Sequence, residues 1–173
     1  MFYKVEYQKR AHQEVEKIFR VLLPEQGLAV REEQIRLCHE MLDTLLGERI
    51  ALCDAGVGIG KTYAYLVACV LMQKYSILME RNSLPKQHPV VVSTSSIALQ
   101  KAILSEYVPF LSRVLVEQAL FRHHFGQWYG KEKNILFVIT GWNEESRLSV
   151  TSRRTQSKEK HCCLCGNIMI WIP

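Results

Sequence analysis

The sequence has very little aspartate and no long apolar run. Asp43 and Asp54 are its two aspartates, and no Asp-Glu pair occurs. The longest apolar stretch, around Ala64 to Met72, is much shorter than the roughly 20 residues that span a bilayer. The N-terminus, MFYKVEYQKR, has no apolar core of a secretory signal. These absences argue against a membrane or secreted protein. We expect a cytoplasmic location, where the six cysteines stay reduced or bind metal.

Composition and charge divide the chain into two parts. With 173 residues, 48% of them apolar and 23% charged, the chain suits one soluble globular domain. Residues 1–118 carry 14 Lys and Arg against 13 Asp and Glu, a net charge of +1. Residues 119–173 carry 8 against 4, a net of +4, and hold all three tryptophans. This break predicts two segments of different character.

The hydrophobic pattern predicts an α/β unit with parallel strands that is preceded by helices. Apolar residues recur at helical spacing before and after two short β-branched or apolar runs, and Gly47 closes the second helix. The segment 76–88 has the composition of a loop. The expected order is helix 8–22, helix 31–46, strand 49–54, helix 61–73, strand 89–93 and helix 97–115.

The sharpest motif is a glycine-rich loop that matches the phosphate-loop (Walker A) pattern with alanine in the first glycine position. Glycines let the backbone curl so that several N–H groups point at one anion, and a helix that starts at the lysine adds its positive end. In this pattern Lys61 reaches the β- and γ-phosphates, and the Thr62 hydroxyl ligates Mg²⁺. The predicted ATP-binding residues of the loop are Ala55, Gly56, Val57, Gly58, Ile59, Gly60, Lys61 and Thr62.

Efficient hydrolysis of ATP needs a second carboxylate motif at the end of another strand. Asp43 lies inside the helix before the loop, Asp54 directly precedes the loop, and Glu144-Glu145 follows Gly-Trp-Asn rather than an apolar run. We therefore assign no catalytic residue and expect binding of ATP and Mg²⁺ without efficient turnover.

Three stretches in this order resemble the start of the superfamily 2 DNA helicases of the DinG/XPD group, over roughly residues 20–118. They are Arg31-Glu32-Glu33-Gln34, Asp54 to Thr62, and Ser93 to Gln100. The resemblance implies a partial P-loop (RecA-like) domain, with Arg31 and Gln34 at the adenine of ATP. It also implies that Ser93, Thr94 and Gln100 help to hold the backbone of single-stranded DNA.

Each of these assignments has a plainer alternative. Gln34 on a helix is often a solvated side chain, and Ser93-Thr94 at a strand end can cap the next helix. Cys38, Cys53 and Cys69 suit small buried apolar positions.

The chain also lacks parts that the resemblance implies. The Asp-Glu-Ala-His-like box, the cysteines of the family's iron–sulfur cluster and the second motor domain have no counterpart here. We therefore expect a helical lead-in at 1–30 and a partial helicase ATP-binding domain at 31–118. We expect the whole to be an N-terminal fragment that is inactive alone.

Residues 119–173 stop resembling the family. Cys162 and Cys165 have Cys-x-x-Cys spacing, next to His161 and Cys163. A zinc site needs a second pair, and His123 and His124 could supply it, but their spacing resembles no familiar motif. Back-translation with a one-base shift turns Phe125 to Thr140 into LRAVVRKGKEHFVCDN, which resembles the family segment that contains the first cluster cysteine. We therefore hypothesise a frameshift near Gln118 to Phe121, which predicts a poorly structured, non-native tail. A genuine divergent extension is the alternative.

These observations favour the ATP-binding part of a DinG-like ATP-dependent DNA helicase, with ATP and weakly bound single-stranded DNA as partners. Two alternatives stay open. The chain could be another phosphate-loop ATPase or a kinase, which would need a substrate lid or a second carboxylate. It could also be a nucleic-acid-binding protein with a zinc-binding tail.

Overall fold

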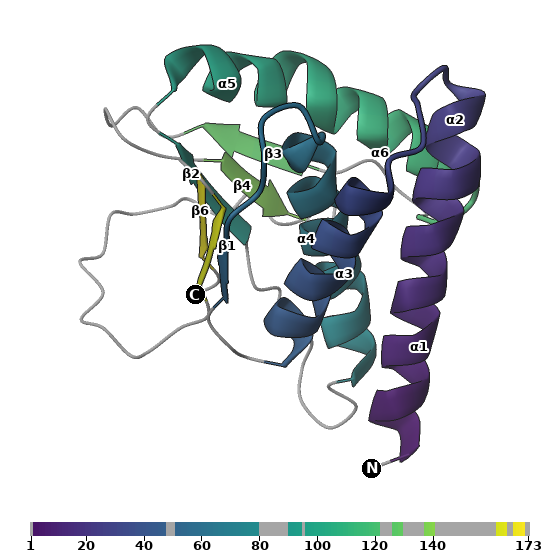
Figure 1. Cartoon of the computed structure of the whole chain (residues 1–173). Coiled ribbons are helices and arrows are strands. Elements are labelled where there is room, and N and C mark those ends of the chain that lie inside the picture. The colour runs from purple at the N-terminus through teal and green to yellow at the C-terminus, as the bar shows by residue number, and fades with distance from the viewer. Residues whose placement is uncertain are drawn as a thin grey trace.

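Helices make up most of the chain that the structure describes (Figure 1). This computed structural model describes residues 2–47, 51–79, 90–94, 96–121, 126–129, 137–140, 162–165 and 168–171. Among these residues no helix is long and apolar enough to cross a membrane.

The N-terminal part is a nearly continuous helical rod followed by a second helix. The rod consists of α1 (Phe2–Lys17), a π-helical turn η1 (Ile18–Leu22) and α2 (Leu23–Glu25). It ends at Gly27, which takes a positive φ of 85°. The next helix, α3 (Glu32–Leu46), has two glutamates in its first turn, where carboxylates favour the positive end of the helix dipole. The predicted helices are confirmed, and the first is longer than expected.

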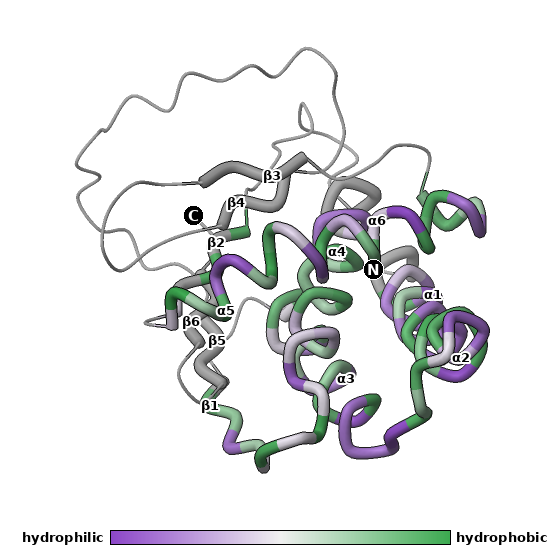
Figure 2. The backbone as a smooth tube through the Cα atoms, turned by 90° about the horizontal axis from the view of Figure 1, so that it is seen from above, coloured by the Kyte–Doolittle hydropathy of each residue, from purple (hydrophilic) through white to green (hydrophobic). Residues whose placement is uncertain are grey.

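The long helix α4 (Lys61–Met79) lies in the middle of the helical layer and packs against both α1 and α3. The green of its tube in Figure 2 shows that it is largely apolar. Every residue from Ala64 to Met72 is buried, so the helix is covered on several sides. It extends beyond the predicted end at about residue 73, and the rest of the expected loop, 80–88, lies outside the described residues.

A third helical segment crosses one end of this layer. It consists of α5 (Ile97–Ala102), the π-helical turn η2 (Ile103–Tyr107) and α6 (Val108–Glu117), which confirms the helix predicted there. Side chains from all three helical segments form one core. Its largest fully buried members are Tyr65, Ile18, Leu22, Met41, Leu42, Leu66, Leu71, Ile103, Leu111 and Leu115.

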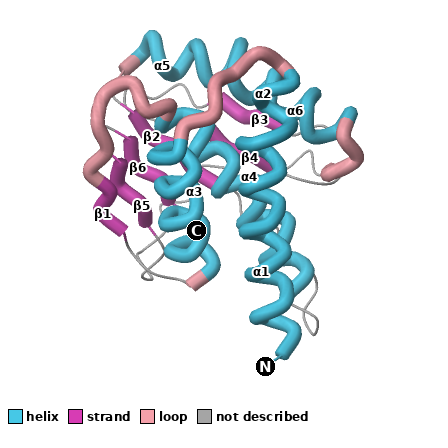
Figure 3. Tube along the Cα trace, turned by 45° about the vertical axis from the view of Figure 1, so that its right-hand side comes forward, coloured by secondary structure: helices cyan, strands magenta, loops and turns pink. Residues whose placement is uncertain are grey.

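Within the described residues, six short strands form one mixed sheet beside α3 (Figure 3). Their order is β1-β5-β6-β2-β4-β3. The strands are β1 (Ala51–Cys53), β2 (Val90–Thr94), β3 (Gly126–Tyr129), β4 (Phe137–Thr140), β5 (Cys162–Cys165) and β6 (Ile168–Trp171).

The sheet differs from the expected parallel arrangement. β1 and β2 are not neighbours, because β5 and β6 lie between them. β1 pairs in parallel with β5, whereas every other pair of neighbouring strands is antiparallel. The expected parallel sheet is therefore not what the described strands form: β5 and β6, from beyond residue 118, separate β1 from β2, and four of the five strand pairs are antiparallel.

The tail is described only in its four strands and in residues 119–121. The backbone of 162–165 and 168–171 belongs to the sheet. His161 and the larger part of 119–173 lie outside the described residues, and so do the side chains of the tail cysteines. The hypothesis of an out-of-frame tail stays a prediction.

Candidate functional site

The glycine-rich loop joins the end of β1 to the start of α4, as the motif predicts. Gly58 and Gly60 both have φ of +86°, a left-handed conformation that L side chains rarely adopt. Val57, which directly precedes Gly58, is fully exposed at the tip of the loop. The two glycines thus curl the chain immediately before Lys61, the first residue of α4.

Two side chains from the start of α3 hold the loop from the other side. The Arg31 guanidinium donates a hydrogen bond to the Gly58 carbonyl. The Gln34 amide nitrogen donates to the Gly60 carbonyl at 2.6 Å. Gln34 is only 6% exposed, so it is not a solvated side chain. The structure therefore brings together the two predicted adenine-binding residues and the predicted phosphate loop.

Gly60 is required for this contact by space as well as by conformation. A Cβ at this position would lie 2.1 Å from the Gln34 amide nitrogen and 2.8 Å from its Cδ. At Gly58 an added Cβ would meet nothing within 4 Å. The close approach of the Gln34 amide thus depends on the absence of a side chain at position 60.

Lys61 folds back over the loop. Its ammonium group donates to the carbonyl oxygens of Ala55 at 2.6 Å and Gly56 at 2.7 Å. The ammonium is thereby held against the loop backbone at the N-terminal end of α4, where the helix dipole also favours an anion. Thr62, in the first turn, is half-buried.

A cavity of about 300 Å³ opens beside the loop, which is at the lower end of the size range of ligand pockets. Its walls come from the rod and the connection that follows it, from the start of α3, from the loop and the first turn of α4, and from η2. It is lined by Phe19, Leu23, Leu28, Ala29, Arg31, Gln34, Gly60, Thr62, Tyr63 and Tyr107.

The aromatic wall of this cavity is a feature that the sequence analysis missed. The Tyr63 and Tyr107 rings meet edge to face with centroids 5.3 Å apart. Burial, and after it the nearby Tyr107 and Glu106, raise the pKa of the Tyr63 hydroxyl. Tyr63 directly follows Thr62 and could have been noticed there. Tyr107 comes from a distant turn, and no local pattern points to it.

A second hollow, of about 260 Å³, lies on the other side of the loop. Three carboxylates and one guanidinium line it, from Glu33, Glu40, Asp54 and Arg36. An excess of negative charge disfavours a phosphate group there. The cavity on the Gln34 side is therefore the better candidate for a nucleotide.

The third predicted motif forms the junction between β2 and α5. Thr94 and Gln100 are 2% and 5% exposed, and the Gln100 amide donates to the Thr94 carbonyl at 2.6 Å. Ser96 caps the helix by accepting from the Leu99 N–H at 3.3 Å. The capping residue is thus Ser96 and not Ser93, whose side chain is not described. Contact of these residues with DNA stays a prediction.

Three cysteines and Asp43, which the sequence analysis also considered, lie in the helical layer or next to it. Cys38 and Cys69 are buried and Cys53 is half-buried, which confirms the apolar interpretation for the first two. Asp43 lies on α3 and accepts a hydrogen bond from His12. Among the described side chains, no group of three or more His, Cys, Asp or Glu could hold a metal ion.

Comparison with known proteins gives a partial match to one kind of protein. The chain is 33% identical over 96 residues to a protein named 3'-5' exonuclease DinG from Bacillus subtilis (strain 168), which is 56% of this chain and 9% of that protein. It is 30% identical over 89 residues to proteins of the same name from Staphylococcus aureus, including strain USA300. No family model matches the chain, and no solved structure matches it.

These matches relate about half of this chain to a small part of much longer proteins, because the chain spans about a tenth of their length. They support a DinG-related origin. The relatives' name denotes an exonuclease and does not specify a helicase.

Proposed function

We propose that this chain binds ATP, with Mg²⁺, through the loop at residues 54–62, as part of a DinG-like nucleic-acid-processing protein. The observation that carries the proposal is the contact of Gln34 with Gly60 at the mouth of the aromatic cavity. It joins two residues that lie 26 positions apart, one from each of the two motifs that we assign to ATP binding.

The residues fit an anion at the loop. Lys61 donates to two loop carbonyls, and a phosphate group could take over these donors at the positive end of α4. Thr62 would present its hydroxyl to Mg²⁺. The ion would offset the negative charge of the phosphates.

The base of the nucleotide would enter the cavity beside Gln34. Arg31 and Gln34 would donate to its ring nitrogens, while Tyr63 and Tyr107 would offer apolar faces. Arg31 and Gln34 must first give up their hydrogen bonds to the loop carbonyls, because both side chains donate to these carbonyls in the structure. We expect nucleotide binding to release the loop from these two side chains.

We further propose that ATP is bound and not turned over efficiently. Neither aspartate is placed to hold Mg²⁺ and a water beside Thr62. Asp43 is paired with His12 on the side of α3 that faces α1, and Asp54 lies in the second hollow. Unwinding of DNA is what the resemblance to the DinG/XPD helicases implies for a whole helicase, and we do not propose it for this chain.

Contact with single-stranded DNA is proposed for the β2–α5 junction on family resemblance. Ser96, Ile97 and Ala98 are exposed there, whereas Thr94 and Gln100 hold the junction from inside. DNA would therefore meet the backbone and the exposed residues, and Gln100 would act by fixing their position.

Equilibrium binding of a fluorescent ATP analogue, with and without Mg²⁺, tests the proposal. Lys61→Ala should weaken binding about 10- to 100-fold, because a charge-assisted contact is worth about 1.5–3 kcal/mol. Lys9→Ala, at an exposed lysine on α1, is the matched control and should leave the affinity unchanged. No binding by the wild type at millimolar analogue, or equal binding by both variants, would refute the proposal.

A further inference from the structure

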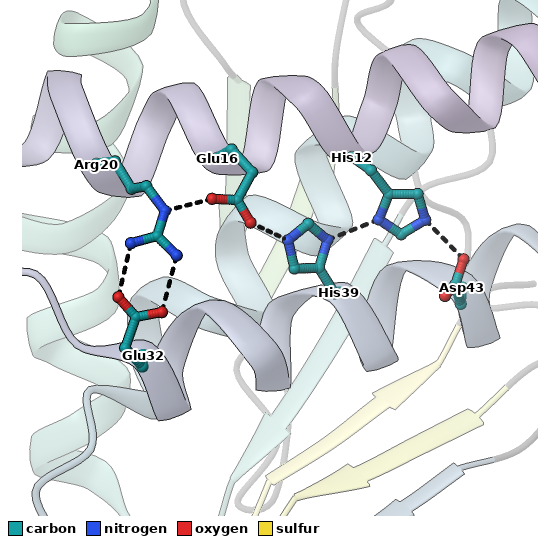
Figure 4. A network of polar contacts seen from close by, with 6 residues as sticks. All are labelled: His12, Glu16, Arg20, Glu32, His39 and Asp43. Carbon is teal, nitrogen blue, oxygen red and sulfur yellow. Dashed lines mark hydrogen bonds and ion pairs between the residues drawn. The ribbon is translucent and has the colours of Figure 1, made fainter.

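Six polar side chains form a continuous network between the N-terminal rod and α3 (Figure 4). His12, Glu16 and Arg20 lie at four-residue intervals along the N-terminal rod. The Arg20 guanidinium donates to both carboxylate oxygens of Glu32, at 2.6 and 2.8 Å, and also to Glu16. The other end of the network contains two histidines in direct contact.

The histidine contact has an unusual geometry. The Nδ1 atoms of His12 and His39 are 2.6 Å apart. The Nε2 atom of His12 is 2.7 Å from an Asp43 oxygen, and that of His39 is 2.8 Å from a Glu16 oxygen. The side chains of the two histidines are 29% and 25% exposed, so water reaches the pair only in part.

The carboxylates of Asp43 and Glu16 determine which ring nitrogens of His12 and His39 carry hydrogens. An ionised carboxylate only accepts hydrogen bonds, so each Nε2 atom carries a hydrogen and donates it. In two neutral rings both Nδ1 atoms would then present lone pairs to each other. In two charged rings both would present N–H groups. A favourable contact at this distance requires one proton between the two atoms.

We propose that His12 and His39 share a single proton between their Nδ1 atoms, and that this bound proton is a pH-sensitive clasp that joins α1 to α3. The separation of 2.6 Å favours a proton over a metal ion. Metal–nitrogen bonds of about 2.0–2.1 Å would hold the two nitrogens further apart.

The charged surroundings favour a cation at this position. Three carboxylates and one guanidinium make up the rest of the network. On α3, Arg36 and Glu40 pair with each other. On α4, which packs against both helices, Lys74 pairs with Glu14 of α1.

The strands β1 and β5, which contact α3, contain no charged residue. The other charged residues of α1 and α3 are Lys4, Glu6, Lys9, Arg10, Lys17 and Glu33, of which Glu6 and Arg10 pair with each other.

The clasp gives stability a bell-shaped dependence on pH. Histidines of the unfolded chain titrate near the ordinary value of about 6.5. Below that pH the unfolded chain binds more protons than the singly protonated pair, so stability falls as the pH decreases. At higher pH the folded pair releases its proton, two lone pairs face each other, and stability falls again.

The clasp also bears on the proposed nucleotide site, and this part rests on the proposed function. The cavity beside the loop lies between the same two elements, with Phe19 and Leu23 from the rod and Gln34 from α3. Loss of the clasp would loosen the rod against α3. Affinity for the ATP analogue should therefore follow the same bell, with its maximum where the proton is shared.

The direct test is NMR of the full chain with ¹⁵N-labelled histidine. A shared proton predicts a ¹⁵N–¹⁵N coupling across the hydrogen bond between the two Nδ1 atoms. The coupling should be present near neutral pH and lost at both lower and higher pH. Its absence at every pH, with each ring titrating alone, would overturn the proposal. So would stoichiometric binding of Zn²⁺ by the pair.

Thermal melts between pH 5.5 and 9 give a second test. The melting temperature of the wild type should fall by about 3 °C on either side of its maximum. His39→Gln and His12→Gln should both flatten this curve, while Arg36→Gln, at an exposed site on α3, should keep it. If the ATP analogue fails to bind at any pH, the proposed function fails, yet the coupling and the melts still decide on the clasp. A curve as bell-shaped in both histidine variants as in the wild type would refute it.

Discussion

The contact between Gln34 and Gly60 yields the sharpest test of the site, by the substitution Gly60→Ala. The new methyl group would lie 2.1 Å from the Gln34 amide nitrogen, so the amide must move away and lose its 2.6 Å bond to the Gly60 carbonyl. The residue would also keep a φ of +86° at a cost of about 1–2 kcal/mol. A lost hydrogen bond from a buried amide adds about 1–2 kcal/mol. We therefore expect Gly60→Ala to lower the free energy of unfolding by about 2–4 kcal/mol in total.

Gly58→Ala separates the two contributions. Gly58 has the same φ, but a Cβ there meets nothing within 4 Å. This variant should lose only the conformational part, about 1–2 kcal/mol. The difference between the two alanine variants measures the displacement of Gln34.

Urea denaturation followed by circular dichroism gives both free energies of unfolding. The double variant Gln34→Ala with Gly60→Ala completes a cycle, since removal of the amide relieves the clash. When Gln34 is already alanine, Gly60→Ala should lower the free energy of unfolding by no more than Gly58→Ala lowers it in the wild type. If the two single glycine variants lose the same free energy of unfolding, the Gln34 side chain is not held against the loop and the reasoning is refuted.

Three further predictions concern the helical layer and its ionisable groups. Lys74→Met leaves the largely buried Glu14 carboxylate without its partner at 2.6 Å and should cost about 1–3 kcal/mol in urea denaturation, whereas a loss below 0.5 kcal/mol would contradict the pairing. Burial raises the pKa of the Cys38 thiol, so at pH 8 iodoacetamide should modify it only after unfolding, as mass spectrometry of peptides would show. The hydrogen bond that Arg20 donates to Glu32 lowers the pKa of the Glu32 carboxyl below its ordinary value of 4.5. Its stabilising contribution is therefore present above pH 4.5 and lost as the pH falls further. Glu32→Gln should reduce the slope of stability against pH below 4.5, and an unchanged slope would count against the pair.

Local patterns were enough to predict the helices and the loop. Apolar residues spaced three and four apart and the stop at Gly47 predicted the bounds of α3 almost to the residue. The Gly-x-Gly-Lys-Thr stretch placed the junction of β1 and α4, because a curled backbone needs glycine and Lys61 can begin a helix. These features depend on neighbours in the sequence, so the sequence alone reveals them.

Features that depend on distant parts of the chain escaped prediction. Tyr107 reaches the cavity from η2 only because α5 to α6 cross the end of the helical layer. The His12–His39 contact depends on the relative rotation of two helices, which no spacing within either helix fixes. The strand order could not be foreseen either, since pairing of β5 with β1 joins residues more than 100 positions apart.

The order of strands still preserves one consequence of the parallel prediction. β5 runs parallel to β1, β6 runs opposite to β5, and β2 runs opposite to β6, so β1 and β2 point the same way. The loop after β1 and the junction after β2 therefore leave the sheet at the same edge. Contact between Tyr63, next to the loop, and Tyr107, in the helical segment that follows the junction, agrees with this placement. A nucleotide at the first and a nucleic acid at the second would thus be neighbours, whichever strands fill the two positions between them.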